Sequence, residues 1–346
     1  MDVTIGAILT QDGIAQGAIY ALLAVALVLV FSVTRIIFVP QGDFVSYGAL
    51  TLASFQLGHV PGTIWVLAAL AVSVSVLEAT RLIFRRATLR SVLSALSLVA
   101  YAAAIALICK FIDVKQLPIG VQILLTVAIV GPMGPCIYRL AFEPIAESSE
   151  LVLLIAAVAV HFAMVGAGLL AFGAEGFRTP ELVSSSFEIA GIVISGQSIA
   201  ILLFGAILIL LLYLIFTRTM PGKALMATAV NRTGAKLVGI GLESSGRFCF
   251  LLAALVGALS GVLISSVTTI YYDSGFLIAL KGFVAAILGG LSSYPITAAG
   301  AIVVGLLESF SSFWASAFKE AILFSLIIPI LLCRSLLLRG TPGDRP

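Results

Sequence analysis

The stretch Ile199-Ala-Ile-Leu-Leu-Phe-Gly-Ala-Ile-Leu-Ile-Leu-Leu-Leu-Tyr-Leu-Ile-Phe216 decides the fold class, because it runs on without a charged side chain. An α-helix needs about 20 apolar residues to cross the hydrocarbon core of a bilayer, and the surrounding run 192–216 supplies them. The whole chain is 61% hydrophobic and 10% charged, whereas soluble domains carry roughly 25% charged residues. The sequence therefore predicts an all-α integral membrane protein.

Eleven apolar runs are candidates for membrane spans. They are 14–33, 44–57, 64–77, 92–112, 117–134, 151–172, 192–216, 248–270, 276–291, 296–313 and 321–338. Two of them, 44–57 and 276–291, are short, and each can be tilted, broken or re-entrant. We therefore expect about 9–11 transmembrane helices in a single domain over 1–346.

The positive-inside rule orients these spans. Basic residues gather in 81–90, in 217–247 and in the tail after 333, whereas 173–191 is mainly acidic. We expect the three basic segments in the cytoplasm, which places the N-terminus outside and the C-terminus inside a multi-pass plasma (inner) membrane protein. The segment 138–150 must then be cytoplasmic although it holds three glutamates and one arginine. Acidic residues count little in this rule, so the arrangement stands.

Several catalytic classes lack their motifs in this chain. There is no Gly-x-x-x-x-Gly-Lys-Ser/Thr phosphate loop, no His-Glu-x-x-His and no Gly-x-Ser-x-Gly. The four cysteines form no Cys-x-x-Cys pair, and the two histidines are far apart. We therefore expect no catalytic, metal or cofactor site, and the net charge of +3 gives no reason to expect nucleic acid as a partner. Glycines at GxxxG spacing, 13 and 17 and then 257 and 261, predict close helix packing.

The longest polar segment, 217–247, predicts two short helices. Thr219 can cap a helix that has Pro221 in its first turn, and Asn231 would end it. Thr233 can cap a second helix that stops at Gly239 or two residues later. The small face of the first helix would let another protein approach closely, although an ordinary amphipathic loop fits the same pattern.

The chain resembles the first of the two permease subunits of ABC importers for branched-chain amino acids, over about 16–45 and 138–338. The residues are Gly17-Ala-Ile-Tyr-Ala-Leu near the N-terminus and Gly222-Lys-Ala-Leu-Met-Ala-Thr-Ala-Val-Asn-Arg in the loop. Further along are Lys281-Gly-Phe-Val-Ala-Ala-Ile-Leu-Gly-Gly-Leu and then Gly305-Leu-Leu-Glu. The resemblance implies a non-enzymatic permease that works in membrane lipid with a second permease, two ATP-binding subunits and an extracytoplasmic solute-binding protein.

The resemblance also implies that 217–247 couples the permease to its ATPases. The residues expected to carry this contact are Gly222, Ala224, Ala227, Asn231, Ala235 and Gly239. Ionisable residues at membrane depth are costly and therefore indicate function, and the candidates for a translocation path are Asp43, Lys281 and Glu308. Asp43 and Lys281 lie near span ends, so snorkelling to the interface is the alternative for both. Pairing of Lys281 with Glu308 would lower the cost of each.

The chain departs from the family pattern at three places. Phe38-Val-Pro-Gln-Gly-Asp43 replaces Asn-Phe-Ala-His-Gly-Glu/Asp, and Ser292-Ser-Tyr-Pro-Ile296 replaces Gly-Ser-x-Pro-Gly. The segment 70–137 looks like an insertion with two extra spans. The substrate therefore stays open among branched-chain or other amino acids, amides such as urea, and short acyl compounds.

Two other functions remain as alternatives. An ion-gradient-driven secondary transporter needs ion ligands at membrane depth, which Glu308 and Asp43 could supply. That reading gives the 217–247 loop no role. An intramembrane enzyme is disfavoured, because the chain shows neither a nucleophile motif nor a set of metal ligands.

Overall fold

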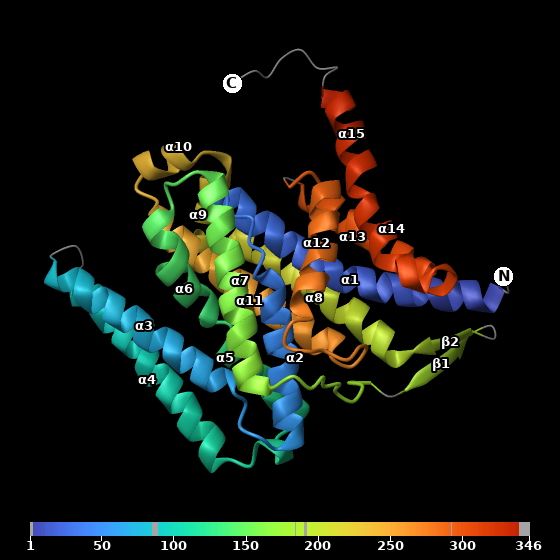
Figure 1. Ribbon diagram of the computed structural model, residues 1–346, viewed down its shortest axis with the longest axis horizontal. Coiled ribbons are helices and arrows are strands. Elements are labelled where there is room, and N and C mark those ends of the chain that lie inside the picture. The colour runs from blue at the N-terminus through green and yellow to red at the C-terminus, as the bar shows by residue number, and fades with distance from the viewer. Residues whose placement is uncertain (1–2, 85–88, 184, 190–191, 292, 339–346) are drawn as a thin grey trace. The chain divides into compact units, whose positions relative to one another are not determined.

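The computed structural model describes residues 3–84, 89–183, 185–189, 192–291 and 293–338, and almost all of its regular structure is helical (Figure 1). The elements are α1 (Val3–Thr34), α2 (Gln41–Leu57), α3 (Thr63–Ile83), α4 (Leu89–Phe111), η1 (Val114–Gln116), α5 (Ile119–Val130), α6 (Met133–Ile137), η2 (Tyr138–Phe142), η3 (Glu143–Ile145), α7 (Glu150–Phe172), β1 (Ser186–Ile189), β2 (Ile192–Ser195), α8 (Gly196–Arg218), α9 (Met220–Val230), α10 (Arg232–Leu237), α11 (Leu242–Ile264), α12 (Gly275–Leu288), α13 (Tyr294–Trp314), η4 (Ser316–Phe318), α14 (Lys319–Ser325) and α15 (Ile327–Leu338). The prediction of an all-α membrane protein is confirmed.

Every one of the eleven apolar runs falls on a helix. Within the described residues, eight helical segments are long and apolar enough to cross a membrane. The other three runs correspond to α2 with 17 residues, α12 with 14, and the broken pair α14 and α15. At 1.5 Å per residue α2 and α12 are roughly 26 and 21 Å long, short of the ~30 Å hydrocarbon core.

The start of one run is different from the prediction. The residues Ile192–Ser195 form strand β2, which pairs antiparallel with β1, so α8 begins only at Gly196. β-Branched residues fill the first three positions of that strand and favour an extended backbone. α8 still has 23 residues, enough to span.

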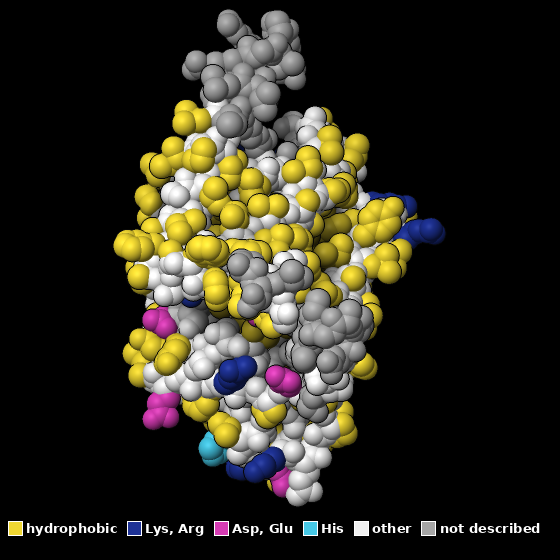
Figure 2. All heavy atoms as spheres, turned by 90° about the vertical axis from the view of Figure 1, so that its right-hand side faces the viewer, with side chains coloured by type: hydrophobic (Ala, Val, Ile, Leu, Met, Phe, Trp, Pro, Cys, Tyr) yellow, Lys and Arg dark blue, Asp and Glu magenta, His cyan; other side chains and the backbone are white. Residues whose placement is uncertain are grey.

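Large apolar side chains lie exposed along the spans. Trp65, Leu124 and Leu170 are 70%, 69% and 91% exposed. Figure 2 shows one face on which hydrophobic side chains are abundant and charged ones few. In a water-soluble protein so much exposed apolar surface would mark interaction sites or aggregation, whereas a lipid solvent covers it without cost.

The chain forms two compact units. The first holds Met1–Val28, Leu182–Ile207 and Ile278–Pro346, and the second holds Leu29–Glu181 and Leu208–Leu277. In the first unit α1 packs closely on α13, because a Cβ at Gly17 would lie 2.7 Å from the Ile302 backbone. In the second unit α2 packs on α11, and a Cβ at Gly261 would lie 2.1 Å from the Val45 carbonyl oxygen. Both predicted GxxxG pairs therefore supply close helix contacts.

Candidate functional site

The loop between α8 and α11 folds as two capped helices. The Thr219 hydroxyl accepts a hydrogen bond from the Gly222 N–H at 3.1 Å, and Pro221 lies in the first turn of α9, as predicted. Gly222 is buried, since an added Cβ would lie 2.0 Å from the Ile215 carbonyl oxygen. This glycine therefore allows α9 to fold back tightly against the end of α8.

Asn231 forms the corner between the two helices. It is the last cap of α9, as predicted, and its side chain also accepts a 2.8 Å hydrogen bond from the Gly234 N–H at the start of α10. The prediction that Thr233 caps the second helix is wrong, because the backbone is already helical at that position. α10 ends before Gly239, whose φ of 87° requires a left-handed backbone.

The surface of α9 and α10 carries several exposed apolar side chains beside the exposed lysines Lys223 and Lys236. Ala235 is buried, and Ala224 and Ala227 are half-buried. Four larger apolar side chains are exposed beyond them: Met226 at 40%, Val230 at 85%, Leu237 at 82% and Val238 at 77%. These four residues, which we call the loop face, lie outside the helices long enough to span. Exposed apolar side chains of this kind are typical of a contact with another protein or with the membrane surface.

Asp43 forms a buried side-chain pair with a histidine that the sequence did not indicate. Its carboxylate lies 2.8 Å from Nδ1 of His161 on α7, and the side chains are 1% and 8% exposed. The Phe276 ring stacks on the His161 imidazole at 4.9 Å. Asp43 therefore does not snorkel to an interface. The sequence offers one indication of His161, namely that it is an ionisable residue within the apolar run 151–172.

Gly275, the first residue of α12, lies against the first turn of α2 within the second unit. A Cβ at Gly275 would lie 2.2 Å from the carbonyl oxygen of Gly42, so the two backbones are almost in contact. Asp43 lies in the first turn of α2, where the helix dipole favours a negative charge. Both helices are short, and short or discontinuous helices often form substrate sites in transporters.

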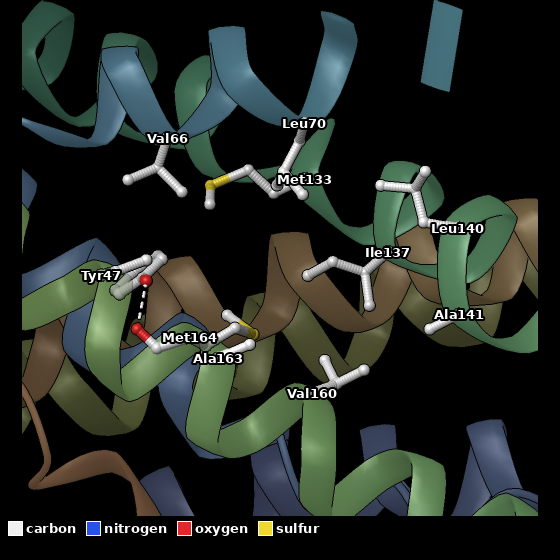
Figure 3. Close-up of a pocket in the computed structure, with 11 residues that line it drawn as sticks. Tyr47, Val66, Leu70, Met133, Ile137, Leu140, Ala141, Val160, Ala163 and Met164 are labelled. Carbon is white, nitrogen blue, oxygen red and sulfur yellow. Dashed lines mark hydrogen bonds between the residues drawn. The ribbon is translucent and has the colours of Figure 1, made fainter. Parts of the chain in front are cut away.

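An apolar cavity of about 220 Å³ is lined on one side by residues of α2 and α7, the two helices that carry Asp43 and His161 (Figure 3). Its lining comes from α2, α3, α6, η2 and α7, with side chains such as Val66, Met133 and Ile137 pointing inward. At one end the Tyr47 hydroxyl donates a 2.6 Å hydrogen bond to the Met164 carbonyl oxygen. That hydrogen bond satisfies the phenol, so the cavity presents an apolar surface.

Lys281 and Glu308 meet in the first unit. The Lys281 ammonium pairs with the Glu308 carboxylate and lies 3.2 Å from an oxygen of Glu320. The Tyr20 hydroxyl donates a 2.5 Å hydrogen bond to the second oxygen of Glu308. Lys281 is 6% exposed and therefore does not snorkel. With two carboxylates and one ammonium, the cluster has a formal charge of −1. Sequence reasoning missed Tyr20 and Glu320.

An ion-pair network gathers three segments that were expected on the same side of the membrane. Glu143 binds Arg247 at 2.8 Å and Arg81 at 3.1 Å. Glu143 belongs to 138–150, the segment whose glutamates are unusual for a cytoplasmic loop. It pairs with two of the arginines, Arg81 and Arg247, that predict the cytoplasmic side. The residues that the structure describes contain no group of three His, Cys, Asp or Glu side chains that could hold a metal ion.

Comparison with known proteins places these features in a family. The model for the permease component of the branched-chain amino acid transport system matches residues 9–332. The permease protein LivH of the high-affinity branched-chain amino acid transport system of Salmonella typhimurium is 28% identical over 255 residues, which cover 71% of this chain and 82% of LivH. LivH of Escherichia coli K12 is equally similar, and BraD of Pseudomonas aeruginosa is 26% identical over 253 residues, with the same coverage. No solved structure gives a significant match.

Proposed function

This chain belongs to the family of permease components of branched-chain amino acid transport systems, and we propose that, as a permease subunit of an ABC importer, it forms part of the translocation path for a branched-chain amino acid or a related amino acid or amide. The observation that carries the proposal is the family match over residues 9–332. The family is a transport family rather than an enzyme class. ATP hydrolysis therefore belongs to partner subunits, and this chain supplies the path and its coupling surface.

The proposed assembly contains a second permease subunit, two ATP-binding subunits and an extracytoplasmic solute-binding protein. The ATP-binding subunit would dock on α9 and α10, where the loop face is exposed. Ala224 and Ala227 contribute the small side chains beside it. Gly222, Asn231, Ala235 and Gly239 act within the chain, because they set the packing, the corner and the end of the two helices.

The proposed path uses the two buried charge clusters. Asp43, held by His161, lies in the first turn of the short helix α2, and short or broken helices are typical of substrate sites in transporters. Lys281 and Glu308 supply a second polar cluster. Buried polar clusters are not needed for helix packing, because an apolar contact of similar volume is often as stable as a buried ion pair. Their presence therefore favours a role in transport.

We propose an inner-membrane orientation with the N-terminus outside and the C-terminus in the cytoplasm. Two observations in the second unit support it. The arginines of 81–90 and 217–247 share Glu143 near the start of α11. Thr179, from the acidic segment 173–191, hydrogen-bonds Ser265 just past the other end of α11 at 2.8 Å. The 23 residues of α11 separate these ends by roughly 35 Å, enough to cross a hydrocarbon core of ~30 Å.

The alternative of an ion-gradient-driven secondary transporter finds no support in the comparisons. The two functions predict different partners: a secondary transporter purifies without an ATPase, whereas an ABC importer subunit purifies with one. Purification in a mild detergent that preserves complexes therefore separates the two functions. We expect an ATP-binding subunit to co-purify with the chain.

Two variants test the docking surface. Ala227→Trp adds an aromatic side chain to the contact, and overpacking costs about 1–3 kcal/mol, where each 1.4 kcal/mol is about tenfold in affinity. Val230→Asp places a charge at a position 85% exposed, so it leaves the fold of the free chain intact. The matched control is Ala79→Trp on an exposed position of α3.

Recovery of the ATPase should fall about tenfold or more in both loop variants and stay at the wild-type level in the control. Wild-type protein that brings down no ATPase would refute the ABC importer. Equal recovery from Val230→Asp and wild type would instead refute the loop face as the docking surface and leave the importer in place.

A further inference from the structure

Glu143 is the centre of a charged network in the second unit. Its carboxylate accepts two hydrogen bonds from the Arg247 guanidinium, at 2.8 and 2.9 Å, and a third from Arg81 at 3.1 Å. Arg81 also lies 3.3 Å from Glu78, which in turn pairs with Arg139 at 2.9 Å. The two-point contact with Arg247 fixes both distance and orientation, as bidentate arginine–carboxylate pairs do.

The carboxylates of this network are enclosed. The side chains of Glu143 and Glu78 are 5% and 3% exposed, whereas Arg81 and Arg247 are 24% and 32% exposed. A buried carboxylate holds its partners far more firmly than a surface pair does, because breaking it leaves an uncompensated charge away from water. The network therefore acts as a stiff connection between the elements that carry it.

Those elements are otherwise distant in the chain. Arg247 lies in the second turn of α11, directly after the proposed ATPase-docking helices. Arg81 and Glu78 lie at the end of α3, and Ser91 at the start of α4 also hydrogen-bonds Glu78. α3 and α4 pack side by side as a hairpin (Figure 1), and together they form most of the insertion 70–137. Glu143 thus ties the start of α11, which follows the docking helices in the chain, to the end of α3 in the predicted insertion.

We infer that Glu143 is a positioning residue for coupling, which transmits displacement of the α9–α10 loop through Arg247 and Arg81 to the α3–α4 hairpin. The inference rests on the proposed function, because it needs an ATPase that moves the loop. It gives the insertion a role: the hairpin is a moving part of the transport cycle rather than a passive addition at the lipid boundary.

Two cysteine labels test this transmission without any transported substrate. Thr233→Cys places a fluorescent probe on an exposed position of α10, and Thr80→Cys places one on an exposed position of α3. The side chains of Cys109, Cys136 and Cys249 are buried and compete little for the reagent, and Cys333→Ser in the background of every variant removes the fourth thiol. The complex with its ATPase is trapped with ATP and vanadate, and each probe's emission is compared with and without trapping.

In the otherwise unaltered complex both probes should change on trapping. In Glu143→Gln the α10 probe should still respond, while the α3 response should fall about tenfold, the size of a typical coupling between sites. Arg81→Gln, which leaves the Arg247–Glu143 contact in place, should give the same result and guards against misfolding of the first variant. The control is Glu147→Gln in the same segment, whose side chain is 90% exposed and pairs only weakly with Lys236 at 3.8 Å.

The possible outcomes distinguish failure of the Glu143 inference from failure of the proposed function. An α3 response that survives in both Glu143→Gln and Arg81→Gln would overturn the inference, as would an α3 probe that never responds while the α10 probe does. Loss of both responses with the ATPase still bound would mean that the network only holds the loop in shape, and the inference falls. Absence of any ATPase from the purified complex would refute the proposed function itself.

Discussion

Replacing Lys281 with methionine should destabilise the protein far more than replacing both Lys281 and Glu308. Methionine keeps the apolar stem and removes the ammonium, which leaves the carboxylates of Glu308 and Glu320 facing each other with only the Tyr20 hydroxyl as a donor. Glu308 has a side chain 8% exposed, so water cannot replace the lost cation. Breaking a buried pair from one side costs about 3–5 kcal/mol.

The double variant Lys281→Met, Glu308→Gln removes both charges. The glutamine can still accept the Tyr20 hydrogen bond, and Glu320, with a side chain 35% exposed, stays partly hydrated. The free energy of unfolding should therefore recover by about 2 kcal/mol or more relative to the single lysine variant. Glu308→Gln alone leaves Lys281 with Glu320 and should cost only about 1–3 kcal/mol.

Unfolding in mixed detergent–SDS micelles measures these free energies, and leucine uptake is measured in parallel. Lys110→Met, at an exposed position of α4, is the control and should stay within about 0.5 kcal/mol of wild type. Additive effects of Lys281→Met and Glu308→Gln would refute the reasoning, because they would mean that the two side chains do not interact. A stable double variant without uptake would place the cluster in the path rather than only in the packing.

Three further predictions follow from single features. Gly222→Ala puts a Cβ 2.0 Å from a carbonyl oxygen of α8 and should cost about 1–3 kcal/mol and reduce ATPase recovery, whereas Gly120→Ala, whose Cβ meets nothing within 4 Å, should do neither. Asp43→Asn keeps the shape of the side chain but removes the carboxylate that contacts His161, so leucine uptake should fall while the amount of folded protein in the membrane is unchanged; normal uptake would remove Asp43 from the path. Reporter fusions within 217–247 should be cytoplasmic and those within 173–191 external, and the opposite result for either would reverse the proposed orientation.

The helices were predictable from the sequence because their signals are local. Apolar runs gave the positions of the eight described helices that are long enough to span, since in lipid the backbone must satisfy its own hydrogen bonds. The first loop helix was equally predictable, as Thr219 and Pro221 act within one turn of each other. The second was not, because Asn231 serves two helices at once and this displaced Thr233 from the cap.

The charge clusters were predictable only in part. Membrane depth marked Asp43, Lys281 and Glu308 as unusual, but their partners depend on which helices pack together. In lipid, helices associate through small residues and complementary shape, and a single sequence does not show which helices fit together. His161 therefore stayed hidden 118 residues from Asp43, although it lies in an apolar run.

The lysine–glutamate pair also bears on how the chain is built into the membrane. Each charge alone would resist insertion by about 2.5–3.5 kcal/mol at the centre of a helix. α12 and α13 are consecutive, so they can leave the translocon as one hairpin with their opposite charges already matched. Tyr20, on α1, is synthesised 288 residues before Glu308, so the hydrogen bond between them forms only after α13 has been made. A chain truncated between α12 and α13 would leave Lys281 unpaired in lipid. We therefore expect membrane quality control to recognise the truncated chain but not the complete protein, in which Lys281 is paired.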